Sequence, residues 1–435
     1  MNFKESVFKS LLWRAVYFFS SLVLNIGIAR YFEASVSGWI YYMINFWSLF
    51  VLVLSLSFEG GMGYYAARKE IPSGKLVALS LLWSVTGGLL SFGFFTLVPT
   101  NANKFIYEKY FSIISAAYIT GYLLITFFVV LFNARKNFVT PFLVHTVFNL
   151  LMFLIIPWSS SPVHHVLGNM TYIALYFTGF FLQGLLFMFL FTSRYTERSE
   201  MSLPASKDVS LIARYSLQAF VANLFGFLLM RLDYWFVEYY SDAPSLGNYI
   251  QVSKMAQLFF IIPTTLSAVV FPFTAAKEDE ENKEKRITSL CRMIFLVSTA
   301  GCLLLAASGK WLFPFLFGNT FSKMYLPFVL LTPGIIALSM HYSLTAYFAG
   351  KNKVVVNIAG SLLSLTIIAI GDFLVIPVYG IAGASAVSSV GYSAYFLFLV
   401  YFFGKTHRSS LWDFIFIRKS DIENLQGLVM GFIKR

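Results

Sequence analysis

Two cations lie inside long apolar runs of this sequence, where a charge is costly to place. Arg231 precedes a short polar break at 240–247, and Lys254 follows it. Each lies roughly 10 to 12 Å below the outer membrane surface if both runs are helical, at 1.5 Å per residue. Inserting a charge into hydrocarbon costs about 2.5 to 3.5 kcal/mol even on the lenient scale, which makes both residues functional candidates. The pair predicts a binding site for a diphosphate or an acidic sugar, since Arg can make two parallel hydrogen bonds to phosphate.

Four further polar residues inside apolar runs are candidates for the same site or for its control. Asp233 and Asp372 are predicted to contact substrate in a cavity, together with the two cations. Glu59, which opens a glycine-rich stretch, is predicted to gate the cytoplasmic side or bind a coupling ion. His341 is predicted to carry a proton, because imidazole titrates near neutral pH. The alternatives are a structural ion network of Arg231 and Asp233, an interface carboxylate at Glu59, and a hydrogen-bonded buried His341.

The elements that must position these residues are membrane-spanning helices. The chain is 58% hydrophobic and 12% charged, whereas soluble domains have about 25% charged residues. Uncharged runs such as 76–99 exceed the ~20 residues that a helix needs to cross a bilayer. The alternation in ~10-residue segments that is typical of outer-membrane barrels is not found. The composition therefore predicts an all-α polytopic membrane protein, and the first apolar run lacks the cleavage site of a signal peptide.

The net charge of +12 follows from membrane topology. Most of the 32 Lys and Arg residues fall in alternate connections between the apolar runs. This asymmetry obeys the positive-inside rule and predicts that both termini are cytoplasmic. No nucleic-acid partner is needed to explain the charge, and we expect a multi-pass protein of the bacterial cytoplasmic (inner) membrane.

The two halves of the sequence repeat one another. Residues 31–42 (YFEASVSGWIYY) match 240–251 (YSDAPSLGNYIQ) without a gap, and 134–139 (ARKNFV) match 349–354 (AGKNKV). Twelve apolar runs can be counted, six in each half, so both halves enter the membrane in the same orientation. This predicts twelve transmembrane helices in two six-helix lobes related by a parallel pseudo-two-fold repeat.

The polar stretches divide the chain into four predicted parts. The N-terminal lobe covers 1–193, a cytoplasmic linker 194–210, the C-terminal lobe 211–404 and a cytoplasmic tail 405–435. The tail carries a capping box, Ser420 to Glu423, ahead of apolar residues at helical spacing. We therefore predict an amphipathic helix on the inner membrane surface over 420–435.

Several segments resemble one transporter family over nearly the whole chain. They are IARYFEASVSGWIYY (28–42), RLDYWFVEYYSDAPSLGNYIQVSKMAQLFFIIPTTLSAVVFPF (231–273), LFGNTF (316–321), FAGKNK (348–353) and LVIPVYGIAGASAVSSVGY (374–392). The set is similar to the polysaccharide and O-antigen flippases of the multidrug/oligosaccharidyl-lipid/polysaccharide (MOP) exporter superfamily. The resemblance implies a flippase that moves an undecaprenyl-diphosphate-linked oligosaccharide, such as an O-antigen, capsule or exopolysaccharide repeat unit, from the cytoplasmic to the periplasmic leaflet.

The same resemblance implies alternating access of a central cavity between two lobes, and a set of partners. These are the lipid-linked oligosaccharide, membrane lipids, H⁺ or Na⁺ as a coupling ion, and a glycan polymerase. No cofactor is expected, and no metal site is predicted, because Cys291 and Cys302 would lie roughly 16 Å apart along one helix.

Three other functions compete with this interpretation. A cation-coupled drug antiporter of the same superfamily typically needs an acid in its first helix, and the first apolar run has none before Glu33. The lipid-II flippase branch usually has two further helices. A membrane-embedded glycan polymerase would have a large outer loop with catalytic residues, and the sequence also lacks a Walker-type ATP motif. We therefore predict a transporter and not an enzyme.

Overall fold

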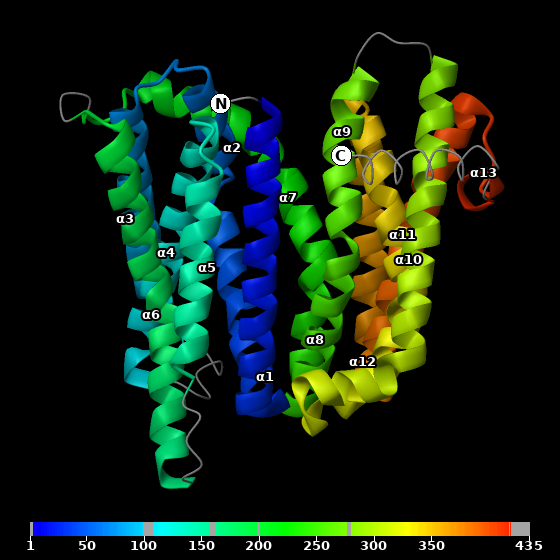
Figure 1. The fold of residues 1–435 in the computed structure, drawn as a ribbon, viewed down its shortest axis with the longest axis horizontal. Coiled ribbons are helices and arrows are strands. Elements are labelled where there is room, and N and C mark those ends of the chain that lie inside the picture. Colours follow the sequence, from blue (N-terminus) through cyan, green and yellow to red (C-terminus); the bar gives the residue numbers. More distant parts are fainter. Residues whose placement is uncertain are drawn as a thin grey trace. The chain divides into compact units, whose positions relative to one another are not determined.

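The computed structural model of the chain describes residues 3–98, 108–156, 162–197, 201–275, 280–416 and 418, and every regular element in them is a helix (Figure 1). The first seven are α1 (Phe3–Ser55), α2 (Phe58–Ala67), α3 (Ser73–Leu97), α4 (Glu108–Ala134), α5 (Val139–Leu154), α6 (Pro162–Tyr195) and α7 (Ser206–Tyr240). The others are α8 (Ala243–Phe259), α9 (Ile261–Ala275), α10 (Glu280–Phe317), the 3₁₀ helix η2 (Asn319–Met324), α11 (Tyr325–Gly350), α12 (Val354–His407) and α13 (Trp412–Ile415). Within these ranges eight helices are long and apolar enough to cross a membrane. The predicted surface helix over 420–435 lies outside the described residues.

Two of these long helices are hairpins. In α1, Glu33 has φ 57° and ψ −175°, and the Tyr41 hydroxyl donates to the Asn25 carbonyl at 3.3 Å, across 16 positions. A straight helix would separate those residues by about 24 Å. In α12 the turn is at Gly380 (φ 55°), and the Ser364 hydroxyl reaches the Gly391 carbonyl at 2.7 Å, across 27 positions. Each long helix therefore consists of two antiparallel arms.

The hairpins lie where the sequence repeat predicts turns. Glu33 occupies the position that matches Asp242 of the second copy, where α7 ends and α8 begins. Asp242 is the N-cap of α8 and accepts the Ser245 backbone N–H at 2.9 Å. In the second repeated pair, Val139 and Val354 are both the first residue of a helix. The all-helical repeat fold is confirmed, while the total of twelve spans stays a prediction.

The chain forms two compact units, Met1–Leu224 and Phe225–Arg435, called here the N-terminal and C-terminal units. Their boundary falls inside α7, because the first part of this helix is bonded to the N-terminal unit. Lys75 pairs with Asp208 at 3.1 Å, and the Asn223 amide donates to the Ser57 hydroxyl at 3.0 Å. The predicted lobe limits, with the linker over 194–210, stay a prediction.

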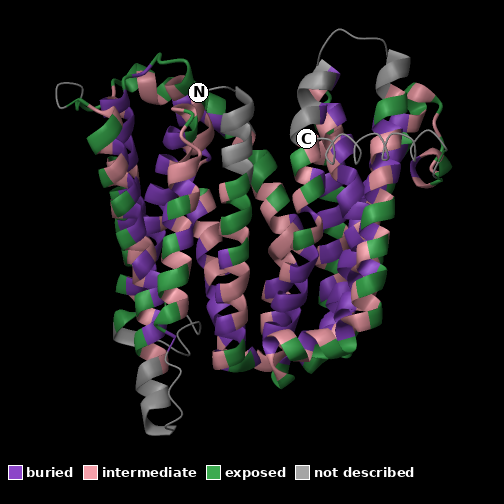
Figure 2. Ribbon diagram, viewed as in Figure 1, coloured by how far each residue is buried: buried purple, intermediate pink, exposed green. Residues whose placement is uncertain are grey.

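Close helix packing holds the N-terminal unit together. A Cβ added to Gly121 of α4 would lie 2.4 Å from the backbone nitrogen of Phe181 in α6, and one added to Gly184 would lie 2.7 Å from the Gly121 carbonyl oxygen. Glycines permit this approach, which replaces the hydrophobic driving force that helices lack in lipid. Aromatic side chains fill the neighbouring core, where the Trp47 and Phe177 rings are 4.7 Å apart. Buried residues line the inside of each unit and exposed ones its flanks (Figure 2).

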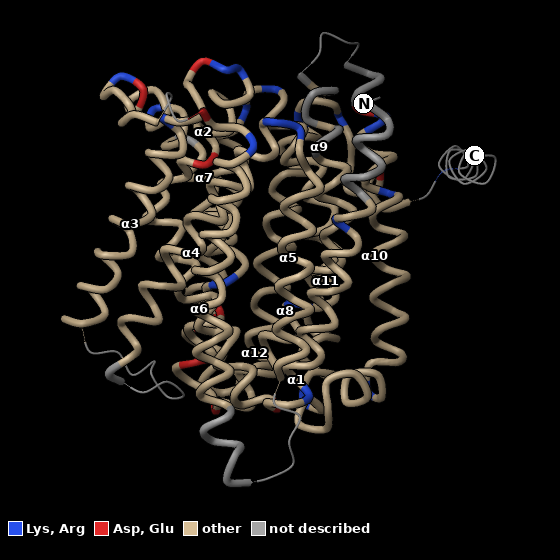
Figure 3. Tube along the Cα trace, turned by 60° about the vertical axis from the view of Figure 1, so that its left-hand side comes forward, with Lys and Arg blue, Asp and Glu red and all other residues tan. Residues whose placement is uncertain are grey.

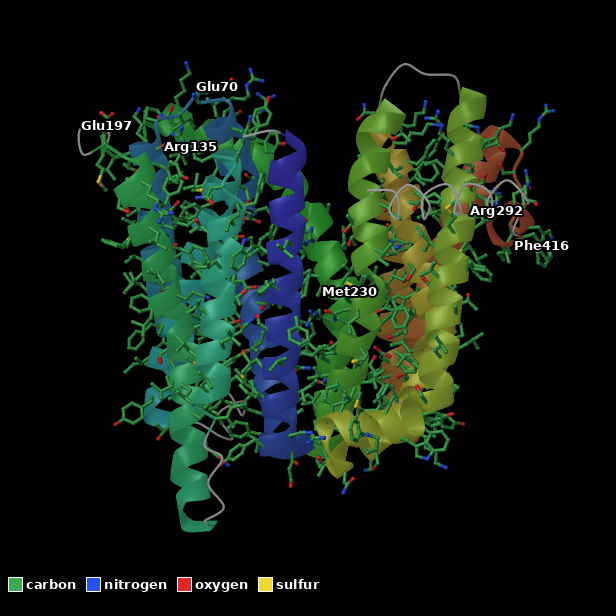
Figure 4. The ribbon with its side chains drawn as sticks, in the orientation of Figure 1. Glu70, Arg135, Glu197, Met230, Arg292 and Phe416 are labelled. Carbon is green, nitrogen blue, oxygen red and sulfur yellow. The ribbon has the colours of Figure 1, made fainter. Side chains whose placement is uncertain are left out.

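Charged residues gather at the helix ends. In each unit most Lys and Arg positions lie at one end of the helices, as the positive-inside pattern predicts (Figure 3). In the C-terminal unit, Arg292 of α10 is 3% exposed and donates to the Asp413 backbone carbonyl at 2.7 Å, which ties α13 to α10 (Figure 4). Which side of the membrane this end faces stays a prediction.

Candidate functional site

The two predicted cations lie on neighbouring helices of the C-terminal unit. Arg231 of α7 donates from Nη2 to Oε1 of Gln257 in α8 at 3.3 Å. Its guanidinium carbon lies 5.5 Å from the centroid of the Tyr234 ring, a cation–π distance. Lys254, almost one turn before Gln257 on α8, is near enough to Arg231 for the two charges to repel. Both cations are half-buried, so together they form a positive site that an anion would stabilise.

Asp233 belongs to a different cluster on the other side of α7. It follows Arg231 by two positions, and side chains at that spacing do not face each other on a helix. The Asp233 Oδ2 atom accepts hydrogen bonds from the Tyr249 hydroxyl of α8 and from the Ser388 hydroxyl of α12 at 3.2 Å. Asp233 is 3% exposed, and its hydrogen bonds come from hydroxyls and not from the guanidinium.

Asp372 is the second acid of this cluster. It lies in the first arm of α12, is fully buried and interacts electrostatically with Asp233. Neither carboxylate oxygen of Asp372, nor Oδ1 of Asp233, has a hydrogen-bond partner among the described residues. Burying ionised carboxylates without partners is costly, so the pair is suited to bind a proton or a small cation.

An aromatic chain leads from the acids toward His341. The Tyr392 hydroxyl of α12 donates to the Leu229 carbonyl of α7 at 3.3 Å, and its side chain interacts with both acids. Tyr395 follows almost one turn later, and its ring centroid lies 4.9 Å from that of His341 in α11. His341 is 6% exposed, and its Nδ1 is hydrogen-bonded to the Leu338 carbonyl. The geometry matches a hydrogen-bonded buried histidine, and a coupling role for His341 stays a prediction.

Glu59 lies in the N-terminal unit, next to a break between α1 and α2. Leu56 and Ser57 have φ values of 48° and 56°, which are unusual for residues other than glycine and indicate local strain. Glu59 is half-buried, and its Oε2 atom is buried without a hydrogen-bond partner among the described residues. The position is suited to the predicted gate, whose role stays a prediction.

The glycines after Glu59 do not form this break. A Cβ on Gly61 would lie 2.8 Å from the Ile212 carbonyl oxygen of α7, and the Gly61 N–H donates to the Ser216 hydroxyl at 3.2 Å. The sequence allows either a kink or a close helix approach at these glycines. The structure places the close approach at Gly61 and the kink before it, at Leu56 and Ser57.

The sequence did not single out the neutral partners of these charges. Gln257, Tyr249, Ser388 and Tyr392 lie in apolar runs together with many other Tyr and Ser residues. A usable signal is that Tyr249 and Gln257 flank Lys254 on one predicted helix. No local signal marks Ser388, because it meets Asp233 across 155 positions.

Solved structures with the same fold are membrane transporters. "Lipid II flippase MurJ, inward closed conformation" has a TM-score of 0.73 and 14% identity, covering 93% of this chain and 89% of that one. An inward-facing multidrug resistance MATE family transporter of the MOP superfamily has a TM-score of 0.65 and 13% identity, covering 92% and 98%. A point mutant of the Vibrio cholerae MATE transporter VcmN has a TM-score of 0.60 and 12% identity, covering 93% and 99%. At these identities the likeness establishes the fold alone.

Comparison of sequences gives the family. No curated protein matches the chain. The family model described as "Polysaccharide biosynthesis protein" matches residues 85–326, more than half of the chain. Together with the fold, this confirms the resemblance to the polysaccharide flippases of the MOP superfamily and a function in membrane transport. The chain therefore belongs to the polysaccharide biosynthesis protein family and is a multi-pass membrane protein with the MOP transporter fold.

Proposed function

We propose that the protein is a flippase of the inner membrane that moves an undecaprenyl-diphosphate-linked oligosaccharide from the cytoplasmic to the periplasmic leaflet by alternating access. The family description and the fold support this class of function. The hydroxyls of a glycan and a diphosphate cannot cross hydrocarbon without polar partners. A protein path with polar contacts is therefore needed for the head group.

One observation carries the proposal, the pair of cations at Arg231 and Lys254. The two charges lie on adjacent helices and repel each other, so a bound anion relieves a cost that the empty site has. Gln257 and Tyr234 hold the guanidinium in place. A pre-positioned Arg with a nearby Lys is suited to a diphosphate, because charge-assisted hydrogen bonds to phosphate are strong. The same charges would repel a cationic drug, which favours a lipid-linked glycan over the antiporter alternative.

We assign Asp233 and Asp372 to a coupling ion, H⁺ or Na⁺. Both carboxylates are buried, and three of their four oxygens have no hydrogen-bond partner in the described part of the chain. This burial suits a proton or a bare cation better than a sugar. The hydroxyls of Tyr249 and Ser388 already orient Asp233, so an ion can bind with little rearrangement. The acids and the cations share α7, through which ion binding can influence the anion site.

The test is charge reversal of the cation pair. We expect the double variant Arg231→Glu, Lys254→Glu to insert normally but to strand lipid-linked glycan on the cytoplasmic face, because two acids repel the diphosphate. Accessibility of the glycan to a lectin in inside-out vesicles measures this. Lys310→Glu, at an exposed position near the end of α10, is the matched control and should behave as wild type. Normal surface glycan in the double variant would refute the assignment.

A further inference from the structure

An apolar groove lies within the C-terminal unit, between α8, α9 and α10. Its volume is 540 Å³, within the range of about 300 to 1,000 Å³ that is usual for ligand pockets. Ser298 is the one residue with a polar side chain among those that line it. The lining residues are Met255, Leu258, Phe259, Ile262, Pro263, Leu266, Leu290, Met293, Ile294, Val297, Ser298, Gly301 and Leu305.

The groove arises because a broken helix packs beside a continuous one. α8 ends at Phe259 and α9 begins at Ile261, whereas α10 continues unbroken past both. Pro263 has no N–H for helical hydrogen bonding, which helps to keep the break open. Contact with α10 is close at the break itself, where a Cβ on Gly301 would lie 2.7 Å from the Phe259 ring. The helices cannot follow each other beyond that contact, and a gap remains.

The groove opens to the surface of its unit. Three residues at its mouth are substantially exposed, Ile262 by 56%, Val297 by 50% and Leu258 by 40%. An apolar gap without a filling loses dispersion contacts along its whole lining. In a membrane, where packing and not the exclusion of water drives association, an apolar chain of matching width would restore those contacts.

The cation site begins where the groove ends. Lys254 immediately precedes Met255 and lies one turn from Leu258, so one side of α8 carries the charge and the adjoining side lines the groove. Gln257, which holds Arg231, lies directly before Leu258. A ligand with an anionic head and an apolar tail could therefore occupy both sites at once.

We propose that this groove binds the first isoprene units of a polyisoprenyl diphosphate, with the diphosphate at Arg231 and Lys254. The assignment rests on the proposed function for the identity of the lipid. Met255 and Met293 line the groove, and flexible thioether side chains adapt to an irregular, methyl-branched chain. The tail is thus held by the protein near its head group, while the remainder of the chain lies in the bilayer.

The test separates binding of the tail from binding of the head. The probes are geranylgeranyl diphosphate and inorganic diphosphate, with the full-length protein in lipid nanodiscs. Val297→Trp fills the groove from α10, and Ile262→Trp fills it from α9. We expect each to weaken geranylgeranyl diphosphate binding by roughly tenfold, the loss for excluding about two methylene groups from an apolar site. Inorganic diphosphate should bind as to wild type, which also shows that the variants are folded.

Leu304→Trp is the matched control, because Leu304 is on α10 but 71% exposed and outside the groove. Unchanged geranylgeranyl diphosphate affinity in both groove variants would overturn the proposal, as would equal competition by a diacyl phosphatidic acid. These results leave the proposed function standing. That function fails instead if wild-type protein binds neither diphosphate probe, or if charge reversal leaves glycan flipping normal.

Discussion

Replacing Asp372 by Leu is expected to stabilise the protein while abolishing its transport. Asp372 is fully buried, and neither oxygen has a partner in the described structure. Leu has the same branched skeleton of heavy atoms, so it needs little repacking. A buried polar group without a hydrogen bond costs about 1 to 3 kcal/mol, so removing two such oxygens gains up to roughly 2 to 6 kcal/mol. The repulsion between Asp372 and Asp233 disappears as well.

The same substitution at Asp233 is the matched control with the opposite sign. Asp233 accepts hydrogen bonds from the Tyr249 and Ser388 hydroxyls. Asp233→Leu leaves both donors buried without their acceptor, at about 1 to 3 kcal/mol for each group that finds no new partner. The two hydroxyls are 3.4 Å apart, so a bond between them offsets part of this loss. We therefore expect a net destabilisation.

Thermal unfolding of the purified variants, followed by tryptophan fluorescence with and without Na⁺, measures both effects. Wild type should gain stability from the ion that binds the acids, whereas Asp372→Leu should unfold at a higher temperature than ion-free wild type and not respond. The lectin assay in vesicles should show no flipping by this variant. An Asp372→Leu protein that unfolds earlier than wild type, or that still flips glycan, would refute the reasoning.

Two further predictions concern packing and pH. Gly121→Ala places a Cβ 2.4 Å from the Phe181 backbone nitrogen, so it should lower the free energy of unfolding by about 1 to 3 kcal/mol; Gly93→Ala, with open space around it, should not lower the unfolding temperature. At the C-terminal end, hydrogen bonds from Ser410 lower the pKa of Asp413, so its contribution to stability is present above the unfolded pKa of about 4 and is lost as pH falls below it. Limited proteolysis of the segment around α13 should therefore accelerate below that pH in wild type, with a smaller change in Asp413→Asn; equal acceleration in both would contradict the role of Asp413.

The sequence was a good guide to the fold because its signals are local. Apolar runs of membrane-spanning length predict helices without knowledge of any contact. The repeated turns place reversals at Glu33 and Asp242, and the structure turns at both. Helical rise alone also predicts that Arg231 and Lys254 lie at one level, and they lie near each other. Each of these inferences needs only positions that are close in the sequence.

The sequence was a weaker guide to the site because its contacts join distant positions. Asp233 and Asp372 share one cluster only because the hairpin of α12 packs against α7. The sequence also left two roles open for the glycines after Glu59, and only the approach of α7 assigns Gly61 to close packing. The groove beside α10 has no signature in the sequence, since its lining is as apolar as the rest of the spans.

The sequence by itself determined that this is a helical, internally repeated membrane protein with two cations inside its apolar runs. Bilayer thickness and the cost of buried charge act on each segment separately, so these properties can be read one segment at a time. Tertiary structure decided which charges meet. It separated Arg231 from Asp233, joined Asp233 to Asp372, and placed an apolar groove beside Lys254. These outcomes depend on how whole helices pack, and the energy of that packing is shared among residues far apart in the chain.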